Sequence, residues 1–255
     1  MVRIDDLKDK CVLVTGASSG IGAAVSRALA AQGARLALHW HANAEGARSV
    51  AAAIGAAGGQ ALLLQGDLAA RGIPRQLVQE AVQALKGLDI LVNCAGALVS
   101  RRAILEADDA LLDAVFDLNA RAVLGTCQAA AIPMKARGGG AIINVGSIAG
   151  LDGGGPGAGL YGASKAWVHN LSRHLAREFA ADNIRVNTVA PGVVQTPFHN
   201  STPPERMEAM RKSVHLGRLG TTDDCVGAFL FLASAQLSGY ITGQIIHVNG
   251  GQVMP

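Results

Sequence analysis

The feature that most constrains the fold of this chain is a regular alternation of short apolar runs with longer helical segments. The apolar runs lie at residues 12–14, 36–38, 61–64, 90–92, 141–145, 185–189 and 245–248. Segments with helical character separate most of them, at residues 21–32, 44–57, 74–85, 108–131, 160–181 and 222–234. Parallel strands need long crossovers, which helices supply with right-handed connectivity. The pattern therefore predicts an α/β protein with a doubly wound parallel sheet.

The composition agrees with such a sheet. Of the 255 residues, 50% are hydrophobic and only 16% are charged. No segment offers the ~18 uninterrupted apolar residues that a membrane-spanning helix needs, so we expect no membrane insertion. Strands covered by helices on both faces are nearly all apolar, which accounts for the composition. The first ten residues carry mixed charges and no apolar run, unlike a signal peptide, and we expect a cytoplasmic protein.

The charged residues and the cysteines argue against two other kinds of binding. The formal net charge is +3, and lysine and arginine are scattered without runs, so we expect no nucleic-acid partner. The four cysteines lie far apart without the paired spacing of zinc sites, so we expect reduced thiols and no metal. No break in composition and no internal repeat divides the chain. Residues 1–255 are therefore predicted to form a single domain.

The first chemical signal is a glycine-rich turn after the first predicted strand. The segment Thr15-Gly-Ala-Ser-Ser-Gly-Ile-Gly22 leaves that strand and opens a helix. Glycines there permit a tight turn and let a pyrophosphate approach the N–H groups of the helix N-terminus. The spacing is not the usual Gly-x-Gly-x-x-Gly, and it lacks the Gly-Lys-Ser/Thr ending of a nucleotide triphosphatase. On its own, the segment also fits a plain strand-to-helix turn.

This segment resembles the cofactor loop of the short-chain dehydrogenase/reductase family, and the resemblance continues to the C-terminus. The other matching elements, in chain order, are residues 93–96 (Asn-Cys-Ala-Gly), Asn119, Ser147, the Tyr161-x3-Lys165 pair, and residues 191–196, 217–220, 240–243 and 249–251. Membership implies a Rossmann-type fold and an NAD(P)-dependent oxidoreductase that transfers a hydride between a nicotinamide cofactor and a carbonyl or alcohol substrate. A ketone, a sugar and a 3-oxoacyl compound all remain open as substrates. The resemblance also implies a homotetramer, with a dimer as the second choice.

The resemblance implies four catalytic residues, namely Asn119, Ser147, Tyr161 and Lys165. In this assignment Tyr161 is the general acid/base, and Ser147 donates a hydrogen bond to the substrate oxygen. Lys165 also binds the nicotinamide ribose, and Asn119 holds a water in a proton relay. Residues four apart share a helix face, so Tyr161 and Lys165 are expected to be neighbours. Because an ammonium favours a nearby phenolate, we expect the pKa of Tyr161 to fall from its ordinary value of ~10.

Each of these residues also has a structural alternative, since Tyr161 could be a half-buried packing residue and Lys165 a solvated one. Ser147, beside a glycine, could be a simple loop former, and Asn119 could mark a kink or satisfy a neighbouring backbone group. Asn93 could support the cofactor loop without touching the cofactor. The interval between Ser147 and Tyr161 is one residue longer than is common in the family. We expect the glycine-rich segment 152–157 to absorb the extra residue as loop.

The cofactor site is predicted at the carboxyl ends of the strands. By resemblance it comprises Gly16, Ser18, Ser19, Gly20, Ile21, Gly22, Trp40, His41, Asp67, Leu68, Asn93, Ala95, Gly96, Tyr161, Lys165, Pro191, Gly192, Val194 and Thr196. NAD enzymes commonly place a carboxylate at the end of the second strand for the ribose hydroxyls. Here Trp40 occupies that position, and His41 stands where NADP-type relatives often have arginine. The missing carboxylate favours NADP, but Ser19 is not the basic residue that many NADP-type members carry, so NAD stays open.

Residues 197–215 are predicted to form a lid over the substrate. The segment holds three prolines and then a helix-like stretch at 205–212, and lids of this kind exclude water. Several basic residues could attract an anionic substrate, although a solvated surface explains them more simply: Arg101, Arg102, His199, Arg206, Arg211 and Lys212.

Two other functions remain open alongside the oxidoreductase. A cofactor-binding regulator would keep the glycine loop and lose turnover, and the complete catalytic set argues against it. A lyase or epimerase would use its cofactor internally, and we expect it to be longer than this chain. The four consecutive large apolar residues 229–232 cannot all face one sheet from a helix. We therefore expect part of this run to meet a second subunit.

Overall fold

The computed structural model describes residues 3–255, and it contains all seven predicted strands in one parallel sheet. The strands are β1 (Cys11–Thr15), β2 (Arg35–Trp40), β3 (Gln60–Gln65), β4 (Ile90–Asn93), β5 (Gly140–Val145), β6 (Ile184–Pro191) and β7 (Ile245–Val248). Their order is β3-β2-β1-β4-β5-β6-β7. The order reverses between β1 and β4, and doubly wound sheets bind ligands at such a switch point. The predicted α/β fold is confirmed.

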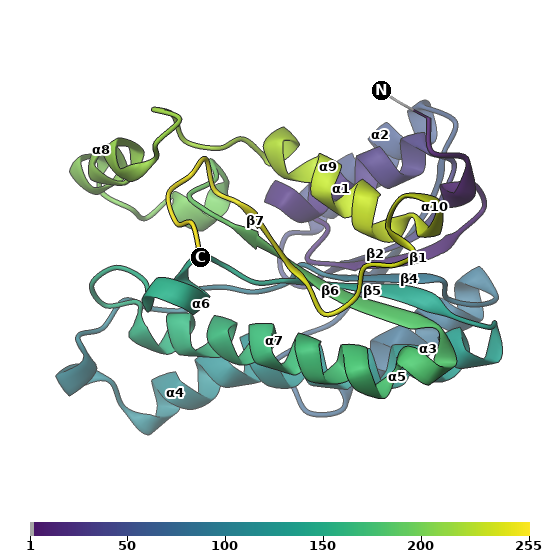
Figure 1. The fold of residues 1–255 in the computed structure, drawn as a ribbon, viewed down its shortest axis with the longest axis horizontal. Coiled ribbons are helices and arrows are strands. Elements are labelled where there is room, and N and C mark those ends of the chain that lie inside the picture. Colours follow the sequence, from purple (N-terminus) through teal and green to yellow (C-terminus); the bar gives the residue numbers. More distant parts are fainter. Residues whose placement is uncertain (1–2) are drawn as a thin grey trace.

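Helices cover both faces of the sheet (Figure 1). On one face lie α1 (Gly20–Ala31), α2 (Ala44–Ala56) and α9 (Thr222–Ala233), and on the other lie α3 (Ile73–Leu85), α5 (Ala122–Ala136) and α7 (Gly159–Glu178). Within β1, Val12 and Val14 pack toward α1 while Leu13 packs toward α3. Side chains alternate across a strand, so a strand buried on both faces must be apolar throughout.

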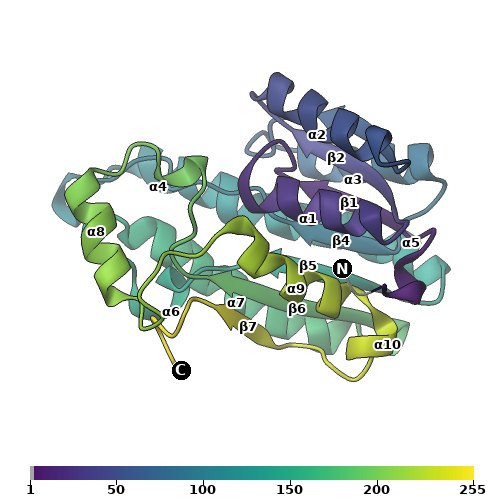
Figure 2. The ribbon, with the colours of Figure 1, turned by 90° about the horizontal axis from the view of Figure 1, so that it is seen from above.

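The shorter elements gather mainly around the carboxyl ends of the strands. They are the helices α4 (Asp109–Phe116), α6 (Ala149–Asp152), α8 (Pro204–Ser213) and α10 (Ala235–Ser238), with single 3₁₀ turns at Asp5–Leu7, Ile104–Glu106, Ala180–Asp182 and Pro197–His199. Helix α8 stands apart from the helical layers, at the same end of the molecule as α4 and α6 (Figures 1 and 2). In the part of the chain that is described, no helix is long and apolar enough to cross a membrane.

The predicted helix at 108–131 is divided in the structure. Helix α4 passes into a π-helical turn (Asp117–Arg121) before α5 begins. Inside this turn, the amide nitrogen of Asn119 donates to the carbonyl oxygen of Val115 at 3.0 Å. A side chain thus bonds to a carbonyl one turn back along the helix, and π-helical turns of this kind are frequent at functional sites. The sequence predicted one helix over this segment, and the alternative that Asn119 marks a kink agrees with the turn.

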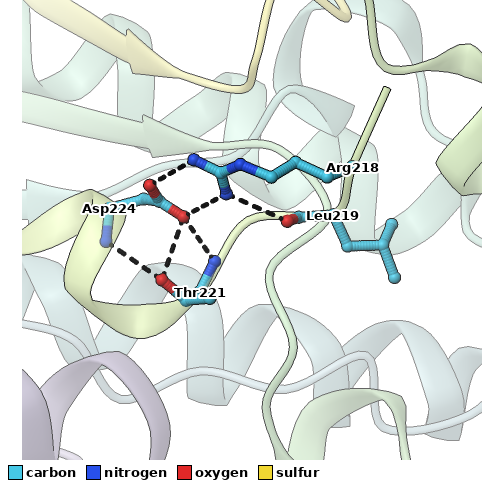
Figure 3. Close-up of polar contacts among 4 residues, drawn as sticks. All are labelled: Arg218, Leu219, Thr221 and Asp224. Carbon is cyan, nitrogen blue, oxygen red and sulfur yellow. Dashed lines mark hydrogen bonds and ion pairs between the residues drawn. The ribbon is translucent and has the colours of Figure 1, made fainter. Parts of the chain in front are cut away.

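A polar network fixes the start of α9 (Figure 3). The Thr221 hydroxyl accepts from the backbone N–H of Asp224, and the Asp224 carboxylate accepts from the backbone N–H of Thr221, which forms a capping box. Arg218 donates to both carboxylate oxygens of Asp224, at 2.7 Å each. The adjoining Gly220 pairs with Val194. The network therefore anchors the chain that returns from α8.

Replacing the capping residue should destabilise the fold measurably. We expect Thr221→Ala to lower the free energy of unfolding by about 1 kcal/mol, because the backbone N–H of Asp224 loses its acceptor. The matched control is Thr222→Ala, one residue further on, which leaves the capping box intact. Urea unfolding of both variants checks this. Equal midpoints would show that the capping box contributes no stability.

The apolar run at residues 229–232 does not form the exposed patch expected from the sequence. Phe229, Leu230 and Leu232 are buried, and Phe231 is half-buried against the same core. Helix α9 packs against α1 as well as against β5, β6 and β7. Neighbours within the same subunit therefore cover most of the run, and Phe231 is the member that stays partly exposed. Contact of this run with a second subunit stays a prediction.

Candidate active site

A cavity of about 740 Å³ lies at the carboxyl ends of the strands. It extends from the glycine turn at residues 16–22, past the ends of β2, β4 and β5, to Tyr161 and the segment 191–199. Its volume is within the range typical of small-molecule sites. All the sequence-predicted site residues line it except Trp40, Asn93 and Asn119. Most of the residues that the resemblance assigns to catalysis and to the cofactor therefore lie around one continuous cavity.

Two glycines of the turn are packed too closely against backbone atoms to carry a side chain. Gly16 has a φ of +66°, and a Cβ there would lie 2.9 Å from the backbone of Ala95. A Cβ on Gly22 would lie 2.3 Å from the carbonyl oxygen of Gly16. The N-cap residue Ser19 makes no capping hydrogen bond through its side chain, so the first N–H groups of α1 keep their capacity to bind an anion. This cradle fits the pyrophosphate of a dinucleotide.

His39, which the sequence gave no role, holds the glycine turn in place. Its Nδ1 accepts from the backbone N–H of Gly16 at 3.1 Å, and its Nε2 lies 3.0 Å from the carbonyl oxygen of Gly66. These partners require a neutral ring with its proton on Nε2. Burial lowers the pKa of His39 and favours the same neutral form. The sequence signal that could have identified it is a histidine within an otherwise apolar part of β2.

Trp40 and Asn93, which were predicted to contact the cofactor, do not line the cavity. Trp40 is half-buried at the end of β2, while its neighbour His41 lines the cavity. The Asn93 amide donates to Oδ1 of Asn144 at 2.9 Å, and its oxygen accepts from Thr126 at 2.8 Å. Asn93 is buried among β4, β5 and α5. This placement corresponds to the supporting role rather than to direct contact.

Asn119 is also buried outside the cavity. Its side chain forms a pair of hydrogen bonds with the backbone of Ala97, accepting at 3.1 Å and donating at 2.9 Å. A Cβ on Gly96 would come within 2.8 Å of Asn119 Oδ1 and 3.2 Å of Lys165 Nζ. Asn119 therefore holds the loop after β4 against Lys165. The alternative that it satisfies a neighbouring backbone group accounts for these contacts.

Tyr161, Ser147 and Lys165 meet at the wall of the cavity. Tyr161 lies in the first turn of α7 and is hydrogen-bonded to Ser147, which follows β5. The Lys165 ammonium donates to the carbonyl oxygen of Val145 at 2.8 Å and lies 5.8 Å from the centroid of the Tyr161 ring. Burial lowers the pKa of Lys165 to about 8. The predicted pairing on one helix face is present.

The direction of the Tyr161 pKa differs from the expectation. Burial raises it to about 12, although the hydrogen bond with Ser147 opposes the rise. A buried phenolate loses its hydration, and the Lys165 ammonium is bonded to a backbone carbonyl below the ring instead of to the phenol oxygen. The phenol is therefore protonated at neutral pH. Sequence spacing placed the two groups together but could not show where the ammonium points.

His169 is a second residue that the sequence did not single out. Its Nε2 accepts from the backbone N–H of Ser147 at 3.4 Å. The ring fits between Gly146 and Gly150, where an added Cβ would lie 2.2 and 2.7 Å from it. Burial, with the charges of His247, Lys165 and Arg173 next in order, lowers its pKa to about 4. The neutral ring therefore supports the backbone on both sides of Ser147.

The predicted lid contributes to the cavity through its first residues and α8. Phe198 and His199 line the cavity, as does Met210. The Phe198 ring lies 5.6 Å from the Tyr161 ring, measured between centroids. Arg211, by contrast, donates to both oxygens of Glu208 at 2.7 Å, and it belongs to the solvated surface of α8.

Known proteins are similar to this chain in sequence and in architecture. Residues 16–252 match the family described as enoyl-(acyl carrier protein) reductase. Nodulation protein G of a Rhizobium species is 38% identical over 98% of this chain and 99% of its own length. The 3-oxoacyl-[acyl-carrier-protein] reductase FabG of Staphylococcus aureus is 36% identical over 96% of this chain and 98% of its own length.

Solved structures agree along almost the whole chain. The NADH-dependent reductase A1-R′, responsible for alginate metabolism, gives a TM-score of 0.90 at 39% identity, covering 98% of this chain and 100% of that protein. A short-chain dehydrogenase/reductase from Serratia marcescens gives 0.91 at 35% identity, covering 97% and 99%. Since sequence and structure both match from end to end, the chain belongs to the short-chain dehydrogenase/reductase family and is an NAD(P)-dependent oxidoreductase acting on carbonyl or alcohol groups.

Proposed function

We propose that this enzyme reduces a carbonyl compound, with Tyr161 as the proton donor. The observation that carries the proposal is the position of the Tyr161 phenol at the cavity wall, beside Ser147 and Lys165. Burial raises the pKa of this phenol to about 12. A phenol that keeps its proton at neutral pH can give it to the oxygen of a carbonyl as that oxygen gains charge. Ser147, beside the phenol, donates a second hydrogen bond to the same oxygen.

The residues around Tyr161 stabilise its phenolate and exclude water from the cavity. The glycine turn would hold a nicotinamide cofactor, which would supply the hydride when bound. Lys165, whose pKa burial lowers to about 8, is still largely charged at neutral pH and stabilises the phenolate left after proton transfer. Phe198 covers Tyr161 from the lid at residues 197–215 and excludes water. We assign Asn119 a positioning role, because its amide is bonded to Ala97 and Val115.

We propose NADP as the preferred cofactor, with NAD as the second choice. The residues from 39 to 43 that line the cavity are His39, His41, Ala42 and Asn43, which include no carboxylate. A carboxylate there would repel a 2′-phosphate and bind free ribose hydroxyls. The same residues include no lysine or arginine, so the 2′-phosphate would gain only hydrogen bonds. The relative A1-R′ is named as NADH-dependent, so NAD remains the second choice of cofactor.

Two opposite substitutions test the cofactor assignment. Trp40→Asp should shift the kcat/KM ratio toward NAD, and His41→Arg should shift it toward NADP, each by about tenfold, since one charge contact of ~1.4 kcal/mol has that effect. Competition between the two reduced cofactors in one assay measures the ratio. Shifts in the same direction for both variants would show that the end of β2 does not contact the adenosine ribose.

A screen with both reduced cofactors tests the reaction itself. The panel comprises simple ketones, oxo sugars and 3-oxoacyl thioesters, and the nicotinamide absorbance reports turnover. The names of FabG and of A1-R′ make acyl and sugar-derived carbonyl compounds the first to examine. Oxidation of the cofactor that depends on a carbonyl compound is the expected result. Cofactor binding without oxidation would indicate a regulator, and product without net oxidation would indicate a lyase or epimerase.

We also propose that the chain acts as one domain and assembles as a cytoplasmic homotetramer, with a dimer as the second choice. Large apolar side chains on the outer surface support association, among them Ile132, of which 73% is exposed, and Tyr240, which is fully exposed. Light scattering at micromolar concentration should give about four times the single-chain mass of 26.0 kDa. A mass near 26.0 kDa would contradict the proposal.

A further inference from the structure

Two arginines from distant parts of the chain converge beside the cavity. Arg101 lines it, and Arg206 approaches it at Gly155, where an added Cβ would lie 3.6 Å from the Arg206 guanidinium. Arg101, in the loop after β4, donates to the carbonyl oxygen of Pro156 at 3.2 Å. Arg206, on α8, donates to the same oxygen at 2.9 Å. Among the described residues neither arginine forms an ion pair with a carboxylate. Each guanidinium has five N–H donors, so most of their donors are available to a ligand.

Contacts between rings connect Tyr161 with His199, which lies near Arg101. Phe198 lies 5.6 Å from Tyr161, and His199 lies 5.1 Å from Phe198, between ring centroids. Burial, and then the nearby charge of Arg101, lowers the pKa of His199. The His199 Nδ1 is buried and has no hydrogen-bond partner within residues 3–255. A donor or acceptor group of a ligand could satisfy it.

Within residues 3–255, no ion pair offsets the positive charge of Arg101 and Arg206. Burial lowers the pKa of Arg101, and repulsion from the Arg206 guanidinium lowers it further. Asp152 also lines the cavity, but it is exposed and accepts from the backbone N–H of Gly154 at 2.8 Å. Asp67 belongs to the opposite end, beside His39. Like charges held together in this way favour binding of an anion.

We propose that Arg101 and Arg206 form a subsite for a carboxylate carried by the substrate. Guanidinium groups bind carboxylates through paired, charge-assisted hydrogen bonds. The inference rests on the proposed carbonyl reduction, because it places the reacting carbonyl at Tyr161 and the carboxylate beyond Phe198. The substrate class is then a small oxo carboxylic acid, and a neutral ketone or thioester is a poorer substrate.

Paired substrates test the subsite in the intact enzyme. The panel is 2-oxobutanoate, 3-oxobutanoate, 4-oxopentanoate and 5-oxohexanoate, each with its methyl ester, assayed with both reduced cofactors. For the acid of the best chain length, kcat/KM should exceed that of its ester by about tenfold or more, as expected for one charge-assisted contact. Arg101→Gln and Arg206→Gln should each raise the KM of the acid by about tenfold and leave the ester unchanged.

The matched control is Arg211→Gln, which removes an arginine of α8 that is already paired with Glu208. It should leave both substrates unchanged. Equal kcat/KM for acid and ester in the wild type would overturn the subsite, as would an equal loss on both substrates in the Arg101 and Arg206 variants. A neutral 3-oxoacyl thioester reduced as well as the best acid would also overturn it.

A binding measurement separates failure of the subsite from failure of the proposed reaction. Calorimetry of glutarate with the enzyme saturated by oxidised cofactor requires no turnover. Binding that is lost in Arg101→Gln and kept in Arg211→Gln would support the subsite even if no carbonyl compound is reduced. Reduction of esters and acids alike, without glutarate binding, would overturn the subsite and leave the reaction standing. Neither reduction nor glutarate binding would overturn both.

Discussion

Tyr161→Phe should lower the rate of carbonyl reduction by about 10²–10⁴-fold, the range that general acid catalysis typically supplies. The substitution removes the phenolic proton and its hydrogen bond with Ser147. The ring remains and can keep its packing against Phe198. Fold and cofactor affinity should therefore change little. Single-turnover rates with saturating cofactor isolate this effect from product release.

The matched control for Tyr161→Phe is Tyr240→Phe, since the chain has only 2 tyrosines and Tyr240 is fully exposed. That variant should keep the wild-type rate. Cofactor titration followed by nicotinamide fluorescence shows whether the Tyr161 variant still binds. A Tyr161→Phe enzyme that keeps more than about a tenth of the wild-type rate would exclude this phenol as the acid.

Gly22→Ala should weaken cofactor binding by about 10- to 100-fold, which corresponds to an overpacking cost of ~1–3 kcal/mol. The added Cβ would lie 2.3 Å from the carbonyl oxygen of Gly16 and 2.9 Å from its carbon. Backbone atoms must therefore move. The displaced segment is the cradle of the pyrophosphate, and Gly16 is also bonded to His39.

Gly227→Ala is the matched control, because a Cβ there meets nothing within 4 Å. Alanine is favoured over glycine inside a helix by up to ~1 kcal/mol, so this variant should be as stable as the wild type or more so. Fluorescence titration with both reduced cofactors and thermal unfolding distinguish the two effects. Full cofactor affinity in Gly22→Ala would mean that the turn does not form the pyrophosphate site.

The sequence was sufficient to predict the parallel sheet, because its strands are buried on both faces. Leu13 and Val14 face opposite cores, and such strands stand out as apolar runs between helices. The glycine turn could also be predicted from the sequence, since Gly16 and Gly22 occupy positions that exclude any side chain. Features that depend only on local pattern and close packing were therefore predictable.

The remaining features depend on where side chains point after the elements pack. The π-helical turn at Asn119 lies within a segment that the sequence predicted as one helix, and only the bonds to Ala97 and Val115 give the residue its role. His39 and His169 support the turn and the serine loop through neutral rings, whose partners are distant in sequence. These contacts arise from tertiary packing and leave no spacing signal.

Hydride transfer is the central claim, and isotope labelling tests it most directly. The wild-type enzyme is incubated with NADPH deuterated at the transferable position, NADH deuterated likewise, and the best carbonyl compound of the panel. The expected product is an alcohol with one deuterium on the former carbonyl carbon, formed in equal amount to the oxidised cofactor. An unlabelled product, or bound cofactor that stays reduced with every carbonyl compound, would contradict the assignment.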